Sequence, residues 1–379
     1  AKQKSVEFLD FHFLCAVAVC GFLHTICLDR EGSVWAFGSN RFGQLGLGDT
    51  LQADTPTKVE NLPPIMNVAC GHYHTVCVDY QGMLWCFGSN DYHQLGDGKR
   101  KDVCIPRQLP NIENVQAVYC GAQHTIFKKD SESKFWGFGS NREGQLGIGQ
   151  NFSSVSVPTA IDMQDVQQVS CGGTHTIYLT TNNKLYGFGS NTAGQLNPSK
   201  PEKKLYLPVR LDVSFDEIIT SIACGFTYSA FLLENGEVHF IGFFTNSATK
   251  KSLCLQKGLP RIKKISPGYN FVLCIDENQQ LWAFGTLASI GLLEPNFGTS
   301  EELSLTPIKL LEGTDISLLS SGGFHYVVKD IERNIWVQGN RQNGQLGAGS
   351  NPVHTPDTLA PHLSSIIGEK FVRIKSARN

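Results

Sequence analysis

The sequence predicts an all-β fold, a seven-bladed β-propeller made of four-stranded repeats about 50 residues long. The first observation is a short apolar run ending in glycine that recurs along the 379 residues at intervals of 50, 51, 50, 53, 43 and 54 residues. The second is a Cys-Gly loop that precedes five of the runs, with Pro-Gly or Ser-Gly in the last two units. The third is a Gly-Gln-Leu-Gly motif that follows three runs and, in altered form, two more. The seven glycines are Gly38, Gly88, Gly139, Gly189, Gly242, Gly285 and Gly339.

Each unit opens with an apolar run, such as Ala16 to Cys20, that leads into Cys-Gly-x-x-His-Thr. Such a short run bounded by glycine is typical of a buried strand. Tyr228 and Phe271 replace the histidine in the fifth and sixth units, and His325 restores it in the seventh. The four complete motifs are Cys20 to Thr25, Cys70 to Thr75, Cys120 to Thr125 and Cys171 to Thr176.

A hairpin and a third strand follow. Asp29 to Gly32 separates two apolar runs and favours a turn with glycine at a positive φ. The run after it, Val34 to Phe37, is too short for a helix and carries an aromatic residue one position after its start. This position holds all five tryptophans of the chain, which we expect at equivalent buried points of different blades: Trp35, Trp85, Trp136, Trp282 and Trp336.

The last part of each unit holds a proline, and five units also hold an exact or altered Gly-Gln-Leu-Gly turn. Proline lacks the N–H that a central strand needs, which places this segment on an outer edge strand or just before it. The prolines are Pro56, Pro106, Pro158, Pro208, Pro260, Pro307 and Pro356.

Units of this size bury both faces only by stacking around an axis, so we expect residues 1–379 to form one propeller domain. Residues 5–14 and 371–375 read as terminal strands that close the ring and remove exposed edges. The expected units span residues 15–66, 67–116, 117–167, 168–220, 221–263, 264–316 and 317–370.

The combination of Cys-Gly-x-x-His-Thr, Trp-x-Phe-Gly-Ser-Asn and Gly-Gln-Leu-Gly resembles the regulator of chromosome condensation repeat family over residues 15–375. The resemblance implies a propeller that acts as a guanine-nucleotide exchange factor, as a ubiquitin-ligase module or as a plain interaction domain. A fold shared so widely does not choose among these functions.

Composition limits the remaining choices. The net charge of −2 gives no strong nucleic-acid signal, and the local basic cluster between Lys200 and Lys264 is either a solvated face or a contact for an anionic partner. Five of the twelve cysteines occupy one repeat position on different blades, so we expect reduced thiols and a cytoplasmic or nuclear protein. No apolar run reaches the length of a membrane span. We expect a monomeric domain.

No catalytic residue, metal or cofactor is predicted. One histidine per blade diverges around a wide ring and cannot bring zinc ligands to a common centre. The glycine-rich Gly43 to Gly48 lacks the Lys-Ser/Thr ending of a phosphate loop and recurs in several blades. No nucleophile, base and orienting acid form a set.

The loops between glycine and histidine carry no carboxylate, although exchange factors of this family use acidic groups in or near these loops. They carry apolar and aromatic side chains, which either anchor a protein partner or plug the central shaft. In the sixth unit, Ile290 to Pro295 resembles the wedge of the Ran exchange factor. The predicted partner-binding residues are Phe22, Leu23, Tyr73, Gln123, Thr174, Phe226, Tyr269, Phe324, Leu292, Leu293 and Glu294.

These observations favour a non-enzymatic protein-interaction propeller that binds a protein through loops at one face. The alternative is a guanine-nucleotide exchange factor for Ran or another small GTPase. A second alternative is the recognition domain of a larger ubiquitin ligase.

Overall fold

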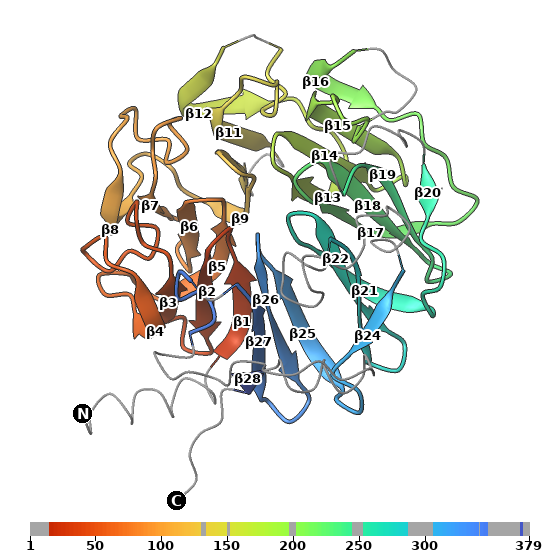
Figure 1. Ribbon diagram of the computed structural model, residues 1–379. Coiled ribbons are helices and arrows are strands. Elements are labelled where there is room, and N and C mark those ends of the chain that lie inside the picture. Colours follow the sequence, from red (N-terminus) through yellow and green to blue (C-terminus); the bar gives the residue numbers. More distant parts are fainter. Residues whose placement is uncertain are drawn as a thin grey trace, which may run out of the picture.

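Seven four-stranded sheets surround a central axis in the computed structural model (Figure 1). The structure describes residues 15–129, 134–149, 152–196, 202–244, 253–286, 306–340, 342–347 and 372–373. These residues form strands, turns and loops without a helix, which confirms the predicted all-β seven-bladed propeller.

The strands of the first four blades are, in chain order, β1 (Cys15–Cys20), β2 (His24–Asp29), β3 (Val34–Gly38), β4 (Ala53–Lys58), β5 (Ile65–Cys70), β6 (His74–Asp79), β7 (Leu84–Gly88), β8 (Val103–Gln108), β9 (Val115–Cys120), β10 (His124–Lys129), β11 (Phe135–Ser140), β12 (Ser154–Ile161), β13 (Val166–Cys171), β14 (His175–Thr180), β15 (Leu185–Ser190) and β16 (Lys204–Arg210). Those of the last three are β17 (Ile219–Cys224), β18 (Tyr228–Leu233), β19 (Val238–Gly242), β20 (Cys254–Leu255), β21 (Ile262–Pro267), β22 (Phe271–Asp276), β23 (Leu281–Gly285), β24 (Ile308–Leu310), β25 (Ile316–Ser321), β26 (His325–Asp330), β27 (Ile335–Gly339) and β28 (Val372–Arg373).

Within each blade, the four strands pair in chain order, with the first near the axis and the fourth at the rim (Figure 1). The register repeats from blade to blade. In the first blade Cys20 lies opposite Thr25 and His24 opposite Gly38. The second blade repeats both pairs one period later. Each motif therefore occupies the same point of every blade that keeps it.

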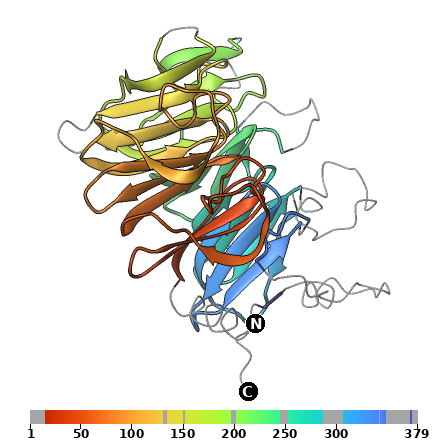
Figure 2. The ribbon, with the colours of Figure 1, turned by 90° about the vertical axis from the view of Figure 1, so that its left-hand side faces the viewer.

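The ring closes where the seventh blade meets the first, and Figure 2 shows the two blades side by side, blue against orange-red. Strand β28 pairs with β27, with Arg373 opposite Trp336, and completes the last sheet. These two residues lie within the segment 371–375, for which a terminal strand was predicted. The predicted strand at residues 5–14 lies outside the described residues.

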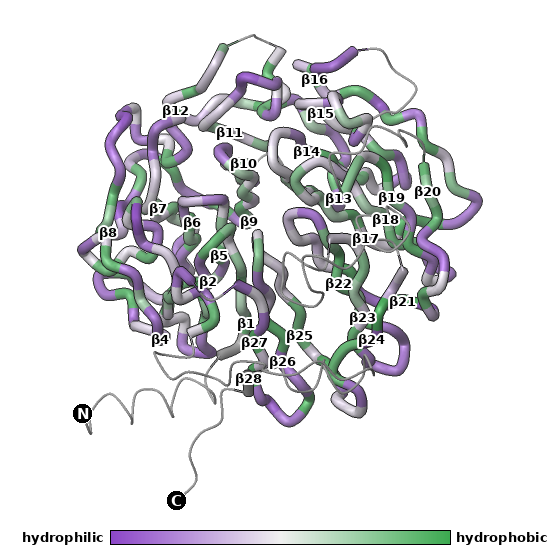
Figure 3. Tube along the Cα trace, in the orientation of Figure 1, coloured by the Kyte–Doolittle hydropathy of each residue, from purple (hydrophilic) through white to green (hydrophobic). Residues whose placement is uncertain are grey.

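The core consists of layers between neighbouring blades. The Phe87 ring packs on the first blade beside Gly46, where an added Cβ would stand 2.9 Å from the ring. Trp85 lies on the same face of β7, one pleat nearer the hairpin turn, and stays half-buried. Trp35 is buried and the other four tryptophans are half-buried, so the predicted positions are equivalent but less enclosed than expected. In Figure 3, hydrophobic stretches lie along the strands and polar ones gather in the turns.

The prolines mark the outer strands in the first four blades. Pro56, Pro106, Pro158 and Pro208 lie within β4, β8, β12 and β16. Pro307 directly precedes β24. Pro260 differs from the prediction, because the fifth outer strand, β20, ends at Leu255 and the proline follows it. Pro356 lies outside the described residues.

Candidate functional site

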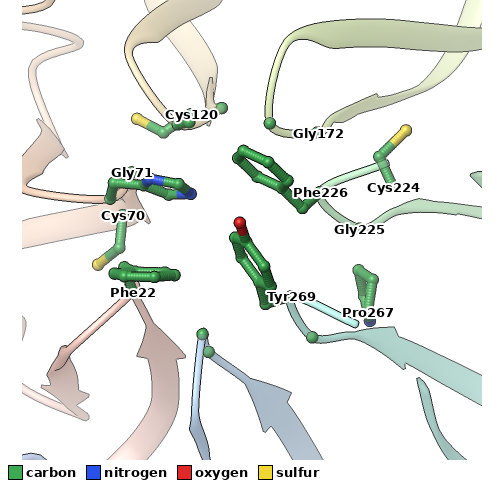
Figure 4. Close-up of a pocket in the computed structure, with 18 of the residues that line it drawn as sticks. Phe22, Cys70, Gly71, Cys120, Gly172, Cys224, Gly225, Phe226, Pro267 and Tyr269 are labelled. Carbon is green, nitrogen blue, oxygen red and sulfur yellow. The ribbon is translucent and has the colours of Figure 1, made fainter. Parts of the chain in front are cut away.

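The loops between the first and second strands of all seven blades meet at the axis. They enclose a channel of about 110 Å³, to which every blade contributes the two residues of its Cys-Gly pair, or their equivalents, and the residue that follows. Figure 4 shows the rings of Phe22, Phe226 and Tyr269 pointing into this channel. The sequence places seven equivalent loops in the chain, and the fold brings them to one point.

Glycine is required in these loops because neighbouring loops pass very close to one another. A Cβ at Gly21 would stand 2.1 Å from the His24 ring and 2.8 Å from the carbonyl oxygen of Gly71 in the next blade. Backbone hydrogen bonds connect the loops around the axis. The Ala122 N–H, for example, donates to the Gly172 carbonyl oxygen at 3.2 Å. The end of the channel is therefore a rigid ring of backbone.

Five aromatic side chains form one cluster here, which we call the aromatic plug: Phe22, His72, Phe226 and Tyr269, which line the channel, and Phe324, which packs against them. Ring-centroid distances are 4.4 Å from Phe22 to His72, 5.6 Å from His72 to Phe226 and 4.3 Å from Phe226 to Tyr269, all stacked. Phe324 closes the set, with centroids 5.0 Å from Phe22 and 5.7 Å from Tyr269. All five residues are half-buried, so each keeps some solvent-accessible surface.

Small residues on other blades make room for these rings. A Cβ at Gly173 would stand 2.4 Å from the Phe226 ring, and a Cβ at Gly323 would stand 2.4 Å from the Phe22 ring. Ala122 holds the equivalent position in the third blade. Four large and three small residues thus share the positions that face the channel.

The second residue of each loop does not line the channel, and this includes Phe324, which joins the plug by packing its ring against Phe22 and Tyr269. Tyr73 contacts Phe42 from the first blade, with ring centroids 5.0 Å apart, and touches Phe22 edge-on at 5.9 Å. Arg41 lies over the Phe42 ring at 5.7 Å. Leu23, Gln123 and Thr174 are half-buried at the equivalent point of their own loops and are not part of the plug. Of the predicted aromatic anchors, four therefore belong to the plug and Tyr73 lies at its margin.

Burial keeps the titratable rings of the plug, and of Tyr73 beside it, uncharged. Desolvation lowers the pKa of His72 to about 4, so the imidazole is neutral at physiological pH and stacks as an uncharged ring. Desolvation also raises the pKa values of Tyr73 and Tyr269, so both phenols keep their protons and can donate hydrogen bonds.

The repeated histidines join neighbouring blades. The Nε2 atom of His24 lies 3.1 Å from the Thr75 hydroxyl, which donates to the Gln44 carbonyl oxygen at 2.8 Å. The same contact occurs at His74, His124, His175 and His325. All five are fully buried, and burial lowers the pKa of each to about 3. They serve as structural hydrogen-bonding groups, as the sequence indicated.

The cysteines of the Cys-Gly pairs are also structural. In Figure 4 the sulfur atoms of Cys70, Cys120 and Cys224 point away from the channel. The Cys224 thiol donates to the Ser170 carbonyl oxygen of the preceding blade at 3.4 Å, and burial raises its pKa to about 12. The five cysteines of this repeat position, Cys20, Cys70, Cys120, Cys171 and Cys224, are free thiols, which agrees with the predicted reduced state.

Two other predictions concern the wedge-like segment and the basic cluster. The wedge-like segment with Leu292, Leu293 and Glu294 lies outside the described residues, as do Lys200, Lys250 and Lys251 of the basic cluster. In the described part of this cluster, Lys204 pairs with Glu143 at 3.1 Å and Arg261 with Glu277 at 3.1 Å. Lys204 and Arg261 of the cluster are therefore matched by a neighbouring carboxylate.

Sequence reasoning left out two members of this site, His72 and Phe42. His72 holds the same loop position as Phe22, Phe226 and Tyr269, so aligning the repeats would have identified it. Phe42 comes from the loop between β3 and β4, and its contact with Tyr73 of the next blade leaves no local signal.

Comparison with known proteins points to one repeat family. Two family models, each described as the regulator of chromosome condensation (RCC1) repeat, match residues 31–78, 81–127 and 134–179, and residues 15–44, 67–94 and 166–195. Among curated proteins of Arabidopsis thaliana, the ultraviolet-B receptor UVR8 is 36% identical over 62% of this chain and 54% of its own length. The mitochondrial RCC1 domain-containing protein RUG3 is 27% identical over 58% of this chain and 52% of its own. The chain thus spans about half the length of these relatives.

A solved structure shares the fold. Yeast RCC1 (Prp20), bound to Kap60, superposes with a TM-score of 0.68 at 22% identity, over 81% of this chain and 78% of the yeast chain. A second structure of Prp20p is described together with its binding properties to Gsp1p and histones. At this level of identity, the likeness establishes the shared architecture.

Proposed function

We propose that this chain, which belongs to the regulator of chromosome condensation repeat family, is a protein-binding propeller whose partner docks on the face that carries the aromatic plug. The observation that supports this proposal most directly is the half-buried cluster of five rings at the centre of that face. Large aromatic side chains at the centre of a surface are the usual energetic anchors of protein interfaces.

The plug is suited to binding because it is already ordered. Its rings stack on one another, and the backbone ring beneath them is tied by hydrogen bonds between blades. A partner that covers these rings buries apolar surface, and little side-chain entropy is lost because the rings are already ordered. Around the plug, Tyr73 and Gln123 supply half-buried polar groups that can orient the partner.

The buried histidines support a binding role over a catalytic one. Each of the five directs Nε2 to a hydroxyl of the next blade, and a pKa of about 3 makes such an imidazole a very weak base at neutral pH. A general base must also reach a substrate proton, and these rings have no exposed surface.

Protein binding is also described for a relative. The yeast RCC1 structure contains Kap60, and a second study of that protein concerns Gsp1p and histones. These partners belong to the yeast protein. For the present chain they support the choice of a protein as the class of ligand.

A set of pull-downs tests the proposal. The immobilised propeller is offered a panel of nucleotide-free small GTPases, and affinities for any retained protein are measured with Tyr73→Ala and Phe324→Ala. We expect each change to weaken binding by about 2 kcal/mol with the melting temperature nearly unchanged. Tyr80→Ala is the matched control, because Tyr80 is 64% exposed in the hairpin turn after β6, at the opposite end of the blade. Loss of folding in place of loss of binding would instead make the plug a structural element.

Exchange activity on Ran is measured separately. Since the loops at this face carry no Asp or Glu between glycine and histidine, we expect little or no acceleration of GDP release. Fluorescent-GDP release by stopped flow decides the point. Strong acceleration at catalytic protein concentration would favour the exchange-factor alternative and make Leu292, Leu293 and Glu294 the first residues to mutate.

A further inference from the structure

The outer strands of three consecutive blades expose an aliphatic side chain directly before their proline. Ile105, Val157 and Leu207 are 50%, 53% and 55% exposed, respectively. Threonine holds the position before proline in the first blade, at Thr55, and in the sixth, at Thr306. Single exposed aliphatic residues are ordinary on protein surfaces, but three at one repeat position form a pattern.

Hydrogen bonds between blades hold the backbone next to these side chains. The residue before each aliphatic one accepts a hydrogen bond from a glycine N–H in the preceding blade's loop. These bonds are Gly48 to Cys104 at 2.8 Å, Gly98 to Ser156 at 2.9 Å and Gly149 to Tyr206 at 2.7 Å. The three strands and the loops between them therefore form a continuous rim from the first blade to the fourth.

Basic side chains accompany the aliphatic ones. Arg100 reaches from the loop of the second blade to the Ser154 hydroxyl of β12 at 3.5 Å. Lys204 on β16 reaches back to the Arg142 carbonyl oxygen at 3.2 Å. The described loops and outer strands of these blades hold more cationic side chains than carboxylates. The five carboxylates are Asp91, Asp97, Asp102, Glu143 and Glu202, and the eight cations are Lys99, Arg100, Lys101, Arg107, Arg142, Lys203, Lys204 and Arg210.

The rim is thus locally basic on a chain whose net charge is −2. Two of the five carboxylates are already paired within it, Asp97 with Arg107 at 3.0 Å and Glu143 with Lys204 at 3.1 Å. The remaining positive charge favours an acidic partner.

We propose that this aliphatic–basic stripe, made of Ile105, Val157, Leu207, Arg100 and Lys204, docks an acidic peptide segment that carries aliphatic side chains. The aliphatic residues of the peptide cover the three exposed side chains, and its carboxylates pair with the cations between them. Protein is favoured over nucleic acid because a phosphate backbone gains nothing from exposed aliphatic groups. The stripe lies on the outer strands, apart from the plug at the axis.

Selection from a random short-peptide phage library tests this proposal. We expect the full chain to enrich peptides rich in Asp, Glu and aliphatic residues. A fluorescent copy of an enriched peptide is then titrated by anisotropy against Ile105→Thr/Val157→Thr/Leu207→Thr and against Arg100→Glu/Lys204→Glu. Each set should weaken binding about tenfold or more. The threonines copy what the first blade carries at Thr55, so these variants should keep the wild-type melting temperature.

Two controls separate this surface from the plug. Leu51→Thr removes an aliphatic side chain that is 71% exposed on the first blade and should leave the peptide affinity unchanged. Phe324→Ala should also leave the peptide affinity unchanged, whether or not it weakens binding of the partner proposed for the plug. The proposal is overturned if no acidic peptide is enriched, or if enriched peptides bind the threonine variant as tightly as the wild type. Binding of a short DNA duplex that depends on Arg100 and Lys204 but not on the aliphatic residues would also overturn it.

Discussion

The imidazole of His325 in the seventh blade lies 2.8 Å from the hydroxyl of Thr25 in the first, measured from Nε2 to Oγ1. The same hydroxyl donates to the Gln345 carbonyl oxygen at 3.3 Å. Three hundred residues separate this pair in the chain. It is the same contact that joins His24 to Thr75 between the first and second blades. The closure of the ring is therefore made by the same type of hydrogen bond that links sequential blades.

Removing this hydroxyl should loosen the closure. Thr25→Val keeps the shape of the side chain but leaves the buried His325 N–H without its acceptor, which should cost about 1–3 kcal/mol of unfolding free energy. Urea denaturation measures the loss. Thr57→Val, at an exposed threonine of β4, is the control and should change stability by less than about 0.5 kcal/mol. Equal stability of the two variants would show that the His325–Thr25 bond contributes nothing to closure.

Acid should destabilise the propeller in a defined pH range. The five buried histidines have a pKa of about 3 in the native state against 6.5 when exposed. Between these values the unfolded chain binds more protons, so native stability falls as the pH falls below 6.5. At one pH unit below 6.5, each buried histidine lowers the free energy of unfolding by about 1.4 kcal/mol.

Urea unfolding between about pH 7.5 and pH 5 checks this dependence. Five histidines together remove about 7 kcal/mol near pH 5.5, which is comparable with the whole stability of many domains. We therefore expect cooperative unfolding in that range. A midpoint that does not change with pH would show that the imidazoles are not held neutral by burial.

The indole N–H groups of the tryptophans should contribute different amounts to the stability of the fold. The Trp85 Nε1 atom donates to Asp79 at 2.9 Å, and the same carboxylate accepts the backbone N–H of Met83 at 2.9 Å. In the third blade Lys129 replaces the aspartate, and the buried Nε1 of Trp136 has no acceptor among the described residues. Trp85→Phe should therefore lower the free energy of unfolding by about 1 kcal/mol or more beyond the loss caused by Trp136→Phe. Denaturation of the two variants measures this difference. A larger loss for Trp136→Phe would contradict this account.

Two glycines of one loop provide a test of packing between blades. Gly46 has a φ of 69° and its added Cβ would stand 2.9 Å from the Phe87 ring, whereas at Gly48, with a φ of 91°, the nearest atom would be 4.0 Å away. Both substitutions to alanine carry the backbone cost of a positive φ, about 1–2 kcal/mol. Gly46→Ala should add about 1–3 kcal/mol from overpacking. Thermal denaturation of the pair isolates that difference, and equal losses would mean that Phe87 can move aside.

Local chemistry determined much of this fold in advance. The glycine-ended run with its tryptophan, the Asp29 to Gly32 turn and the outer-strand proline each depend on neighbours in sequence, so one repeat defines one blade. The spacing of the seven copies then predicts the number of blades. The same reasoning correctly assigned the histidines to structure, because a residue that recurs in successive blades serves the repeat.

Only the tertiary structure decided how the loops share the axis. Each loop offers two side chains, and nothing local determines which one faces the channel or how many large rings the channel accepts. Gly173 leaves room for Phe226 of the next blade, and Gly323 leaves room for Phe22 across the closure of the ring. The diameter of the ring sets that space, and the ring exists only when the first and last blades meet. The plug is therefore a property of the closed propeller, because its members come from blades far apart in the chain.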